Sequence, residues 1–210
     1  HYKKVSSLAK GRWIEALDVS RVRVKDRRET GSFQLLANEN LRLANAILEL
    51  NRFGYLDEIS EAEKAMKENV EINWNILESQ FTLVNIFTRQ EKYSEAISLL
   101  KSVEEDFNEQ KTYQYQAELS RAKYELAQAE GRWNEAIDSC ETFIEISQKC
   151  GQYWELARKL IDLGDAYMGR NKPGDRERAR ETYQQSLDMF TEMGAPGYIK
   201  VLEERLGKLH

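Results

Sequence analysis

The chain has 210 residues, of which 41% are apolar and 32% are charged, and its two prolines suit a helical protein with one continuous core. The formal net charge of -5 gives no general electrostatic reason to bind nucleic acid or an anionic membrane. No apolar run approaches the roughly 18 to 20 residues that cross a bilayer, and no signal-peptide pattern opens the chain, so we expect a soluble, cytoplasmic protein.

Histidine and cysteine restrict the chemistry that the sequence offers. The two histidines are the terminal residues His1 and His210, so the interior provides no imidazole as metal ligand, general base or partner of a nucleophile. Cys140 and Cys150 lie in one predicted helical stretch, about 15 Å apart along it, which is too far for a disulfide. We expect two reduced packing residues, no cofactor, no metal and no catalytic residues.

The first predicted helix spans about residues 13–25. The residues before its turn at Gly11 contain no initiator Met and only the last turns of a preceding helix, which indicates a first unit that is truncated. Basic residues crowd the end of this segment. They are Arg21, Arg23, Lys25, Arg27 and Arg28. They are either a solvated helix C-terminus, where cations complement the helix dipole, or a docking patch for an acidic segment or phosphate.

Paired helices follow along the chain, each pair with helical spacing of its apolar residues. In chain order, the predicted helices lie at 33–53, through Met66 to Ile72, from about 74 to a turn at 91–92, from Tyr93 after that turn, at 113–130, at 133–149, from Tyr153, through Ala179 to Phe190, and at 198–209. An extended turn occupies 169–175. The units are therefore 1–30, 31–72, 73–110, 111–151 and 152–194, with a terminal helix 196–209.

One turn recurs between the helices of a pair. Gly131-Arg132-Trp133-Asn134-Glu135-Ala136 resembles Gly11-Arg12-Trp13-Ile14-Glu15-Ala16 and Glu91-Lys92-Tyr93-Ser94-Glu95-Ala96. Alignment on the alanine gives Ala16, Ala62, Ala96, Ala136 and Ala179, at intervals of 46, 34, 40 and 43 residues. A small residue is needed there because the two helices of a pair cross most closely at that point. The pattern predicts a repeated helix pair.

The repeat resembles a tetratricopeptide repeat (TPR) array, whose period is 34 residues. Leu163-Gly164-Asp165-Ala166-Tyr167 matches the first-helix motif, Ala96, Leu100 and Val103 match the second helix, and Trp13, Tyr93 and Trp133 match the aromatic after the turn. Val84 and Tyr124 stand where the family has Gly, and the Pro between units is missing. The longer units are similar to arrays at the C-terminal end of large bacterial signalling ATPases, nucleotide cyclases and transcription regulators.

The resemblance implies an all-α fold, a right-handed α-solenoid of about five antiparallel helix pairs with a C-terminal capping helix, as one domain over 1–210. It also implies a concave groove, lined by first helices, that binds a protein or peptide partner. The groove-facing positions are Glu78, Phe81, Asn85, Arg89, Glu118, Arg121, Glu125, Gln128, Arg158, Ile161 and Asp165. A clamp for a C-terminal carboxylate is not predicted, because Phe81 stands where Lys is required and Glu125 adds negative charge.

We therefore expect a non-catalytic interaction scaffold from a larger regulatory protein. Gly164-x-x-x-x-Gly169 lacks the Lys-Ser/Thr of a phosphate loop and falls in a repeat helix. Trp74 and Trp154 are expected to pack between repeats. The alternative is a spacer or self-association module, because a half-repeat exposes the apolar face of Trp13 and Leu17 to a second copy.

Overall fold

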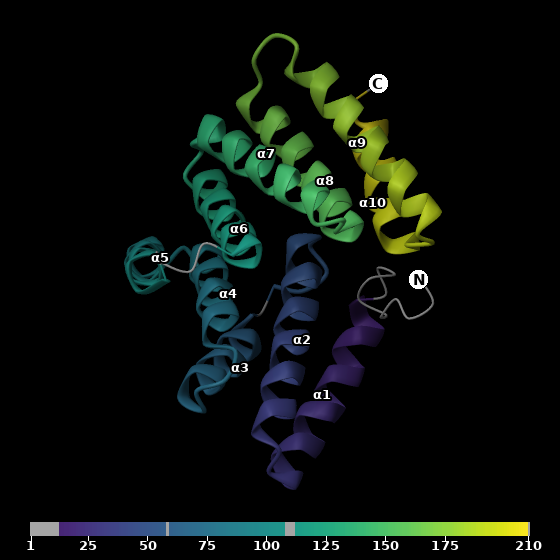
Figure 1. The fold of residues 1–210 in the computed structure, drawn as a ribbon. Coiled ribbons are helices and arrows are strands. Elements are labelled where there is room, and N and C mark those ends of the chain that lie inside the picture. Colours follow the sequence, from purple (N-terminus) through teal and green to yellow (C-terminus); the bar gives the residue numbers. More distant parts are fainter. Residues whose placement is uncertain (1–12, 58, 108–111, 210) are drawn as a thin grey trace. The chain divides into compact units, whose positions relative to one another are not determined.

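The computed structural model describes residues 13–57, 59–107 and 112–209, and all regular structure in these ranges is α-helical. The helices are α1 (Trp13–Thr30), α2 (Phe33–Arg52), α3 (Ser60–Glu71), α4 (Ile76–Arg89), α5 (Tyr93–Phe107), α6 (Tyr113–Ala129), α7 (Trp133–Lys149), α8 (Tyr153–Arg170), α9 (Asp175–Glu192) and α10 (Pro196–Gly207), as labelled in Figure 1. The predicted all-α class and the order of helix pairs are confirmed.

Two helix ends differ from the prediction. Helix α1 continues through the basic residues to Thr30, and Gly31, whose φ of 68° lies in the left-handed region, follows it. Helix α8 continues through Gly169 to Arg170, and Asn171 ends it with a φ of 52°. The turn before α9 is thus shorter than the expected 169–175. The expectation for the truncated opening concerns residues 1–12, which lie outside the described part of the chain.

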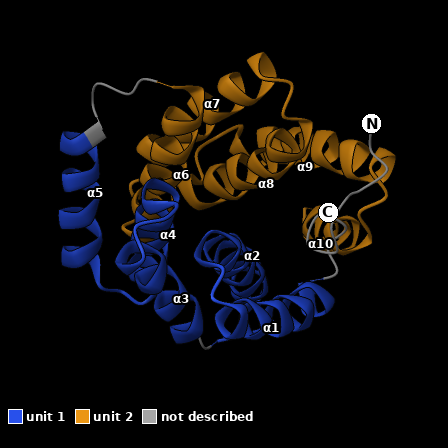
Figure 2. Cartoon of the chain, turned by 60° about the horizontal axis from the view of Figure 1, so that its bottom comes forward, with its two compact units in different colours: residues 1–106 blue, residues 107–210 orange. Residues whose placement is uncertain are grey.

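The chain divides into two compact units, residues 1–106 and 107–210, which Figure 2 colours separately. In the first unit α2 contacts both α1 and α3, and α3 also contacts α4. In the second unit each helix from α6 to α10 contacts the next one along the chain. Each unit is thus a row of helices joined by short turns. One uninterrupted domain over 1–210, and a right-handed course for it, stay predictions.

The alanines that are predicted to mark the closest approach of paired helices are largely buried. Ala62, Ala96, Ala136 and Ala179 are all completely buried, and Ala16 is half-buried. The two cysteines are both free, but the expectation that both are packing residues is wrong for one of them. Cys140 is buried in α7, whereas Cys150 is exposed just after that helix.

Polar side chains connect the helices of the first unit. The Nδ2 group of Asn69 in α3 donates to the carbonyl of Ala37 in α2 (3.0 Å) and to Oγ of Ser79 in α4 (3.2 Å). Its Oδ1 accepts from Nδ2 of Asn40 at 2.9 Å, and Asn69 is completely buried. A buried amide with partners on two neighbouring helices fixes how α3 sits between them, because any shift leaves polar groups unsatisfied.

Aromatic rings make the equivalent connections in the second unit. Trp154 at the start of α8 packs edge-on against Phe190 of α9 at 4.9 Å and Tyr198 of α10 at 5.3 Å, and Phe190 and Tyr198 stack at 4.3 Å. Trp154 thus packs within its own unit and against the terminal helix, so its expected packing between repeats stays a prediction. Trp74, by contrast, is 43% exposed.

Candidate functional site

The predicted groove residues of α4 are largely taken up by the fold itself. Phe81 is completely buried and Asn85 is 2% exposed, so the expectation of a partner-accessible side chain is wrong for these two. Glu78 is half-buried. Arg89 reaches back to the end of α2, where its Nη1 group donates to the carbonyl oxygen of Leu48 at 2.7 Å. A cation at a helix C-terminus complements the helix dipole, which gives Arg89 a structural role.

In the second unit the predicted residues lie on α6 and α8. Arg121 pairs with Glu118 of its own helix (3.5 Å) and Arg158 pairs with Glu155 of its own helix (3.1 Å). Glu125 and Gln128 are half-buried, whereas Ile161 is completely buried. For Arg121, Glu125, Gln128 and Arg158, as for Glu78 of α4, a role in partner binding stays a prediction.

Asp165 has partners on both of the helices that follow it. Its Oδ1 accepts the Tyr183 hydroxyl of α9 at 2.7 Å, and its carboxylate accepts Nε and Nη2 of Arg205 of α10 at 2.8 and 2.9 Å. Burial and the adjacent Asp165 carboxylate raise the pKa of Tyr183. Asp165 therefore holds α8, α9 and α10 together, a role that the groove hypothesis did not foresee.

The self-association alternative is contradicted for the two side chains that it names, Trp13 and Leu17. Trp13 is 5% exposed and Leu17 is 6% exposed, so neither side chain presents an apolar surface. The Trp13 ring stacks on Phe53 at 4.8 Å with an interplanar angle of 27° and lies 6.0 Å from the Tyr55 ring. The aromatic at the start of α1 thus packs on the end of α2.

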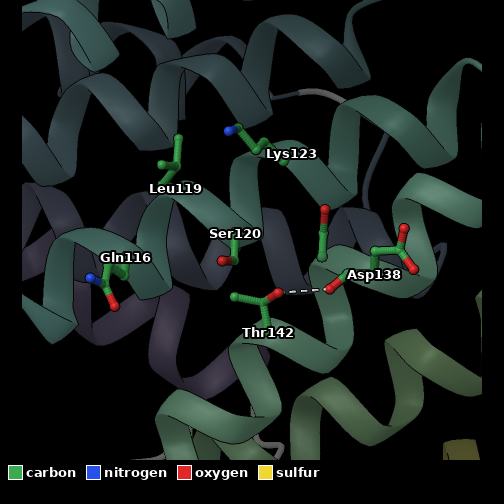
Figure 3. A pocket seen from close by; sticks show the side chains of 7 residues that line it. Gln116, Leu119, Ser120, Lys123, Asp138 and Thr142 are labelled. Atoms are coloured by element: carbon green, nitrogen blue, oxygen red, sulfur yellow. Dashed lines mark hydrogen bonds between the residues drawn. The ribbon is translucent and has the colours of Figure 1, made fainter. Parts of the chain in front are cut away.

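A hollow of about 300 Å³ lies between α6 and α7 (Figure 3). We call it the α6–α7 slot, and its lining residues are Gln116, Leu119, Ser120 and Lys123 of α6 and Asp138, Ser139 and Thr142 of α7. The α6 residues recur every three or four positions and so share one helix face. The Thr142 hydroxyl donates to the Asp138 carbonyl at 2.9 Å, as drawn, and its oxygen keeps acceptor capacity. The slot therefore offers hydroxyls, an amide and one charge of each sign around a single leucine.

In the other three first helices, the position that corresponds to Leu119 contacts the second helix that precedes it along the chain. The four first helices repeat at intervals of 40 residues, and Leu119 corresponds to Glu39, Ser79 and Lys159. Each of these three contacts the preceding second helix. Glu39 lies 3.8 Å from Arg23 of α1, Ser79 accepts from Asn69 of α3, and the Lys159 ammonium lies 5.1 Å from the ring centroid of Phe143 of α7.

The flanking positions show why the α6 copy is different. One turn before, α2, α4 and α8 carry Leu36, Ile76 and Leu156, and one turn after they carry Leu43, Leu83 and Leu163. All but Ile76, which is half-buried, are buried. Helix α6 has Gln116 and Lys123 at these two flanking positions, which are apolar in the other three first helices.

The groove positions predicted from the sequence do not include the lining of the slot, although the sequence contains a pattern that marks it. Alignment on the second-helix alanines gives unequal intervals, which hides the regular 40-residue spacing of the first helices. Alignment on the first helices brings Gln116 and Lys123 into the columns of leucine and isoleucine. A polar residue in two such columns of one copy is a usable signal for an accessible surface.

Among the residues that the structure describes, no helix is both long and apolar enough to cross a bilayer. The same residues contain no group of three or more His, Cys, Asp or Glu side chains placed to hold a metal ion.

Comparison with known proteins assigns no family. No family model matches the chain, and no curated protein matches it. Among solved structures, the chain is similar to a de novo designed helical repeat protein, at 18% sequence identity over 97% of this chain and 94% of that chain, with a TM-score of 0.30.

Proposed function

We propose that this chain is a non-catalytic interaction module of the TPR type, and that it binds a peptide segment of a partner protein in the α6–α7 slot. One observation carries the proposal: α6 has Gln116 and Lys123 where the other three first helices have leucine or isoleucine, and a hollow of about 300 Å³ lies between these residues and α7. The wider context, a larger regulatory protein of the cytoplasm, is part of the proposal and rests on the sequence resemblance.

The chemistry of the slot favours an extended peptide with uncharged polar side chains. Gln116 offers an amide donor and acceptor that match the N–H and C=O groups of a peptide backbone. Ser120, Ser139 and Thr142 add hydroxyls, and Leu119 supplies a small apolar contact. Lys123 and Asp138 balance each other in charge, so the slot has no electrostatic preference for an acidic or a basic ligand.

The experiment is selection of peptides from a random library against the 210-residue chain, followed by titration of the selected peptide against variants. Lys123→Glu reverses an exposed charge in the slot, and Ser120→Tyr fills it. Lys101→Glu reverses an exposed charge on α5 and is the matched control. We expect both slot variants to weaken binding about tenfold or more and the control to leave it unchanged.

Three outcomes overturn the proposal. One is that no peptide is enriched. Another is that both slot variants bind as wild type while circular dichroism shows the same helix content. The third is that Arg121→Glu with Glu125→Lys abolishes binding and the slot variants do not, because this assigns the partner to the groove face of α6.

A further inference from the structure

A lysine and an aspartate form a buried ion pair in α8, the helix that follows the slot along the chain. The Lys159 ammonium donates to Oδ2 of Asp162 at 2.6 Å, and both residues are 3% exposed. The two residues are one turn apart on the same helix, so the ion pair itself joins no two helices. A buried ion pair contributes little net stability, because the loss of hydration offsets the attraction between the charges.

The repeat does not require charge at these two positions. In α6, 40 residues earlier, the corresponding residues are Leu119 and Ala122, and in α4 they are Ser79 and Thr82. The same positions of a first helix thus accept apolar and uncharged residues in other copies. The reason for the lysine of α8 therefore lies in its own surroundings.

The Lys159 ammonium connects the two walls of the slot through aromatic rings. Its Nζ lies 4.8 Å from the ring centroid of Tyr124 in α6 and 5.1 Å from that of Phe143 in α7. Both aromatic residues are buried, and a contact between a cation and a ring is strongest where water is excluded. The Tyr124 hydroxyl also donates to the backbone carbonyl of Asp162 at 3.3 Å. One cation of α8 therefore ties α6 and α7 together at a single point.

The two rings continue the helix faces that line the slot. Tyr124 follows the lining residue Ser120 by four positions on α6, and Phe143 follows the lining residue Ser139 by four positions on α7. Residues four positions apart share a helix face, so each ring lies one turn beyond a lining serine. Phe143 also belongs to a buried cluster with Ala117 of α6. The spacing of the two rings is therefore coupled to the width of the slot.

We propose that Lys159 is a positioning residue for the α6–α7 slot: its ammonium holds the rings of Tyr124 and Phe143 at a fixed spacing and thereby sets the width of the slot. The inference rests on the function proposed for the slot and adds how that site is controlled by the next helix. Asp162 has the supporting role, because its carboxylate neutralises the buried ammonium and fixes its position between the rings.

The test measures the width of the slot without a peptide, as the distance between two spin labels. The labels are attached to Tyr113→Cys at the start of α6 and Glu145→Cys near the end of α7, which are exposed positions outside the lining of the slot. Cys150→Ser removes the exposed native thiol, whereas Cys140 is buried.

The variants separate the charge from the rings. Lys159→Met combined with Asp162→Ala, which we call the charge-free variant, removes both charges, and alanine is the residue of α6 at the second position. Tyr124→Leu removes one ring, whereas Tyr124→Phe keeps it. Arg205→Met is the matched control, because it removes a cation that binds Asp165 of the same helix from α10. Circular dichroism checks that every variant keeps its helix content.

We expect a narrow distribution of label distances in wild type, Tyr124→Phe and Arg205→Met, and a broadened one in the charge-free variant and Tyr124→Leu. The peptide selected for the slot should bind the charge-free variant about tenfold more weakly, while the urea midpoint of this variant stays close to that of wild type.

The inference is overturned if the charge-free variant keeps the narrow distribution, or if Tyr124→Phe broadens it as much as Tyr124→Leu. It is also overturned if the charge-free variant has a broadened distribution but binds the peptide like wild type. A wild-type chain that binds no peptide, while the charge-free variant shows the broadening, contradicts the function proposed for the slot and supports the positioning by Lys159. Failure of the one and failure of the other are thus distinguishable.

Discussion

Gly164 of α8 lies so close to the ring of Tyr183 in α9 that a β-carbon at position 164 would fall 2.3 Å from Cε1 of that ring. The ring has little freedom to move away, because its hydroxyl donates to Oδ1 of Asp165 at 2.7 Å and Asp165 is itself bound to Arg205. Helices α8 and α9 therefore approach each other more closely than any residue with a side chain at position 164 permits.

We predict that Gly164→Ala lowers the free energy of unfolding by about 1–3 kcal/mol, the usual effect of an added methyl group in a packed core. The sign of the change distinguishes a steric clash from helix propensity, because alanine in place of glycine inside a helix otherwise stabilises the helix by about 1 kcal/mol. Gly207→Ala in α10 is the control, since a β-carbon added at that position would meet nothing within 4 Å. Urea denaturation followed by circular dichroism measures both, and equal stability of Gly164→Ala and wild type would contradict the prediction.

The helices and the closeness of their crossings were predictable because local patterns determine them. The spacing of apolar residues marks each helix, and Gly164 and the buried alanines mark positions where only a small side chain fits. The destinations of polar side chains on the first helices were not predictable. Arg89 bonds a carbonyl 41 residues earlier, and the sequence does not distinguish such a contact from one with a ligand. Asn85 and Phe81 were misjudged because periodicity identifies a helix face but not what covers it.

Arg89 offers a test of this structural role. We predict that Arg89→Ala lowers the free energy of unfolding by about 1–2 kcal/mol, because the carbonyl of Leu48 loses a charge-assisted hydrogen bond at the end of α2. Arg42→Ala is the control, because Arg42 is 59% exposed and pairs only with Glu39 of its own helix among the bonds described. We expect this control to change stability by less than about 0.5 kcal/mol. Equal urea midpoints for the two variants would return Arg89 to the candidates for partner binding.

Glu91 occupies a backbone position that suits glycine. Its φ is 60°, in the turn between α4 and α5, whereas the corresponding residues 40 and 80 positions later are Gly131 with a φ of 69° and Asn171 with a φ of 52°. A left-handed conformation costs a residue with a β-carbon about 1–2 kcal/mol. Glycine avoids this cost, but part of the gain in stability is cancelled because glycine makes the unfolded chain more flexible.

We therefore predict that Glu91→Gly stabilises the fold by about 0.5–1 kcal/mol. Glu95→Gly, four residues later inside α5, removes the same exposed acid from a helical position and should destabilise by about 1 kcal/mol. Thermal unfolding of the three proteins should give an order of Glu91→Gly, wild type and Glu95→Gly from highest to lowest midpoint. A Glu91→Gly midpoint at or below wild type would contradict the assignment of strain to this turn.

Asp175 at the start of α9 gives the fold a dependence on acid. Its side chain is 2% exposed and accepts Nε and Nη2 of Arg170 at 2.9 and 2.7 Å and the backbone N–H of Lys172 at 2.9 Å. The Arg170 hydrogen bonds lower the pKa of Asp175 from its ordinary 3.8 to about 2. Because the folded-state pKa lies below the unfolded one, the carboxylate stabilises the fold fully above about pH 4 and loses this effect as the pH falls toward 2.

We predict that Asp175→Asn lowers the free energy of unfolding by about 2 kcal/mol near neutral pH, since the amide has the same shape but neither the charge nor the second acceptor oxygen. The gap between wild type and variant should then narrow from about pH 4 downward, because protonation removes the same charge from wild type. Asp188→Asn, at an exposed position of the same helix, is the control and should differ from wild type by less than about 0.5 kcal/mol throughout. Urea titrations at neutral pH, near pH 4 and near pH 2.5 measure this difference in the free energy of unfolding. A difference that stays constant across that range would show that the Arg170 contact does not stabilise the ionised form of Asp175.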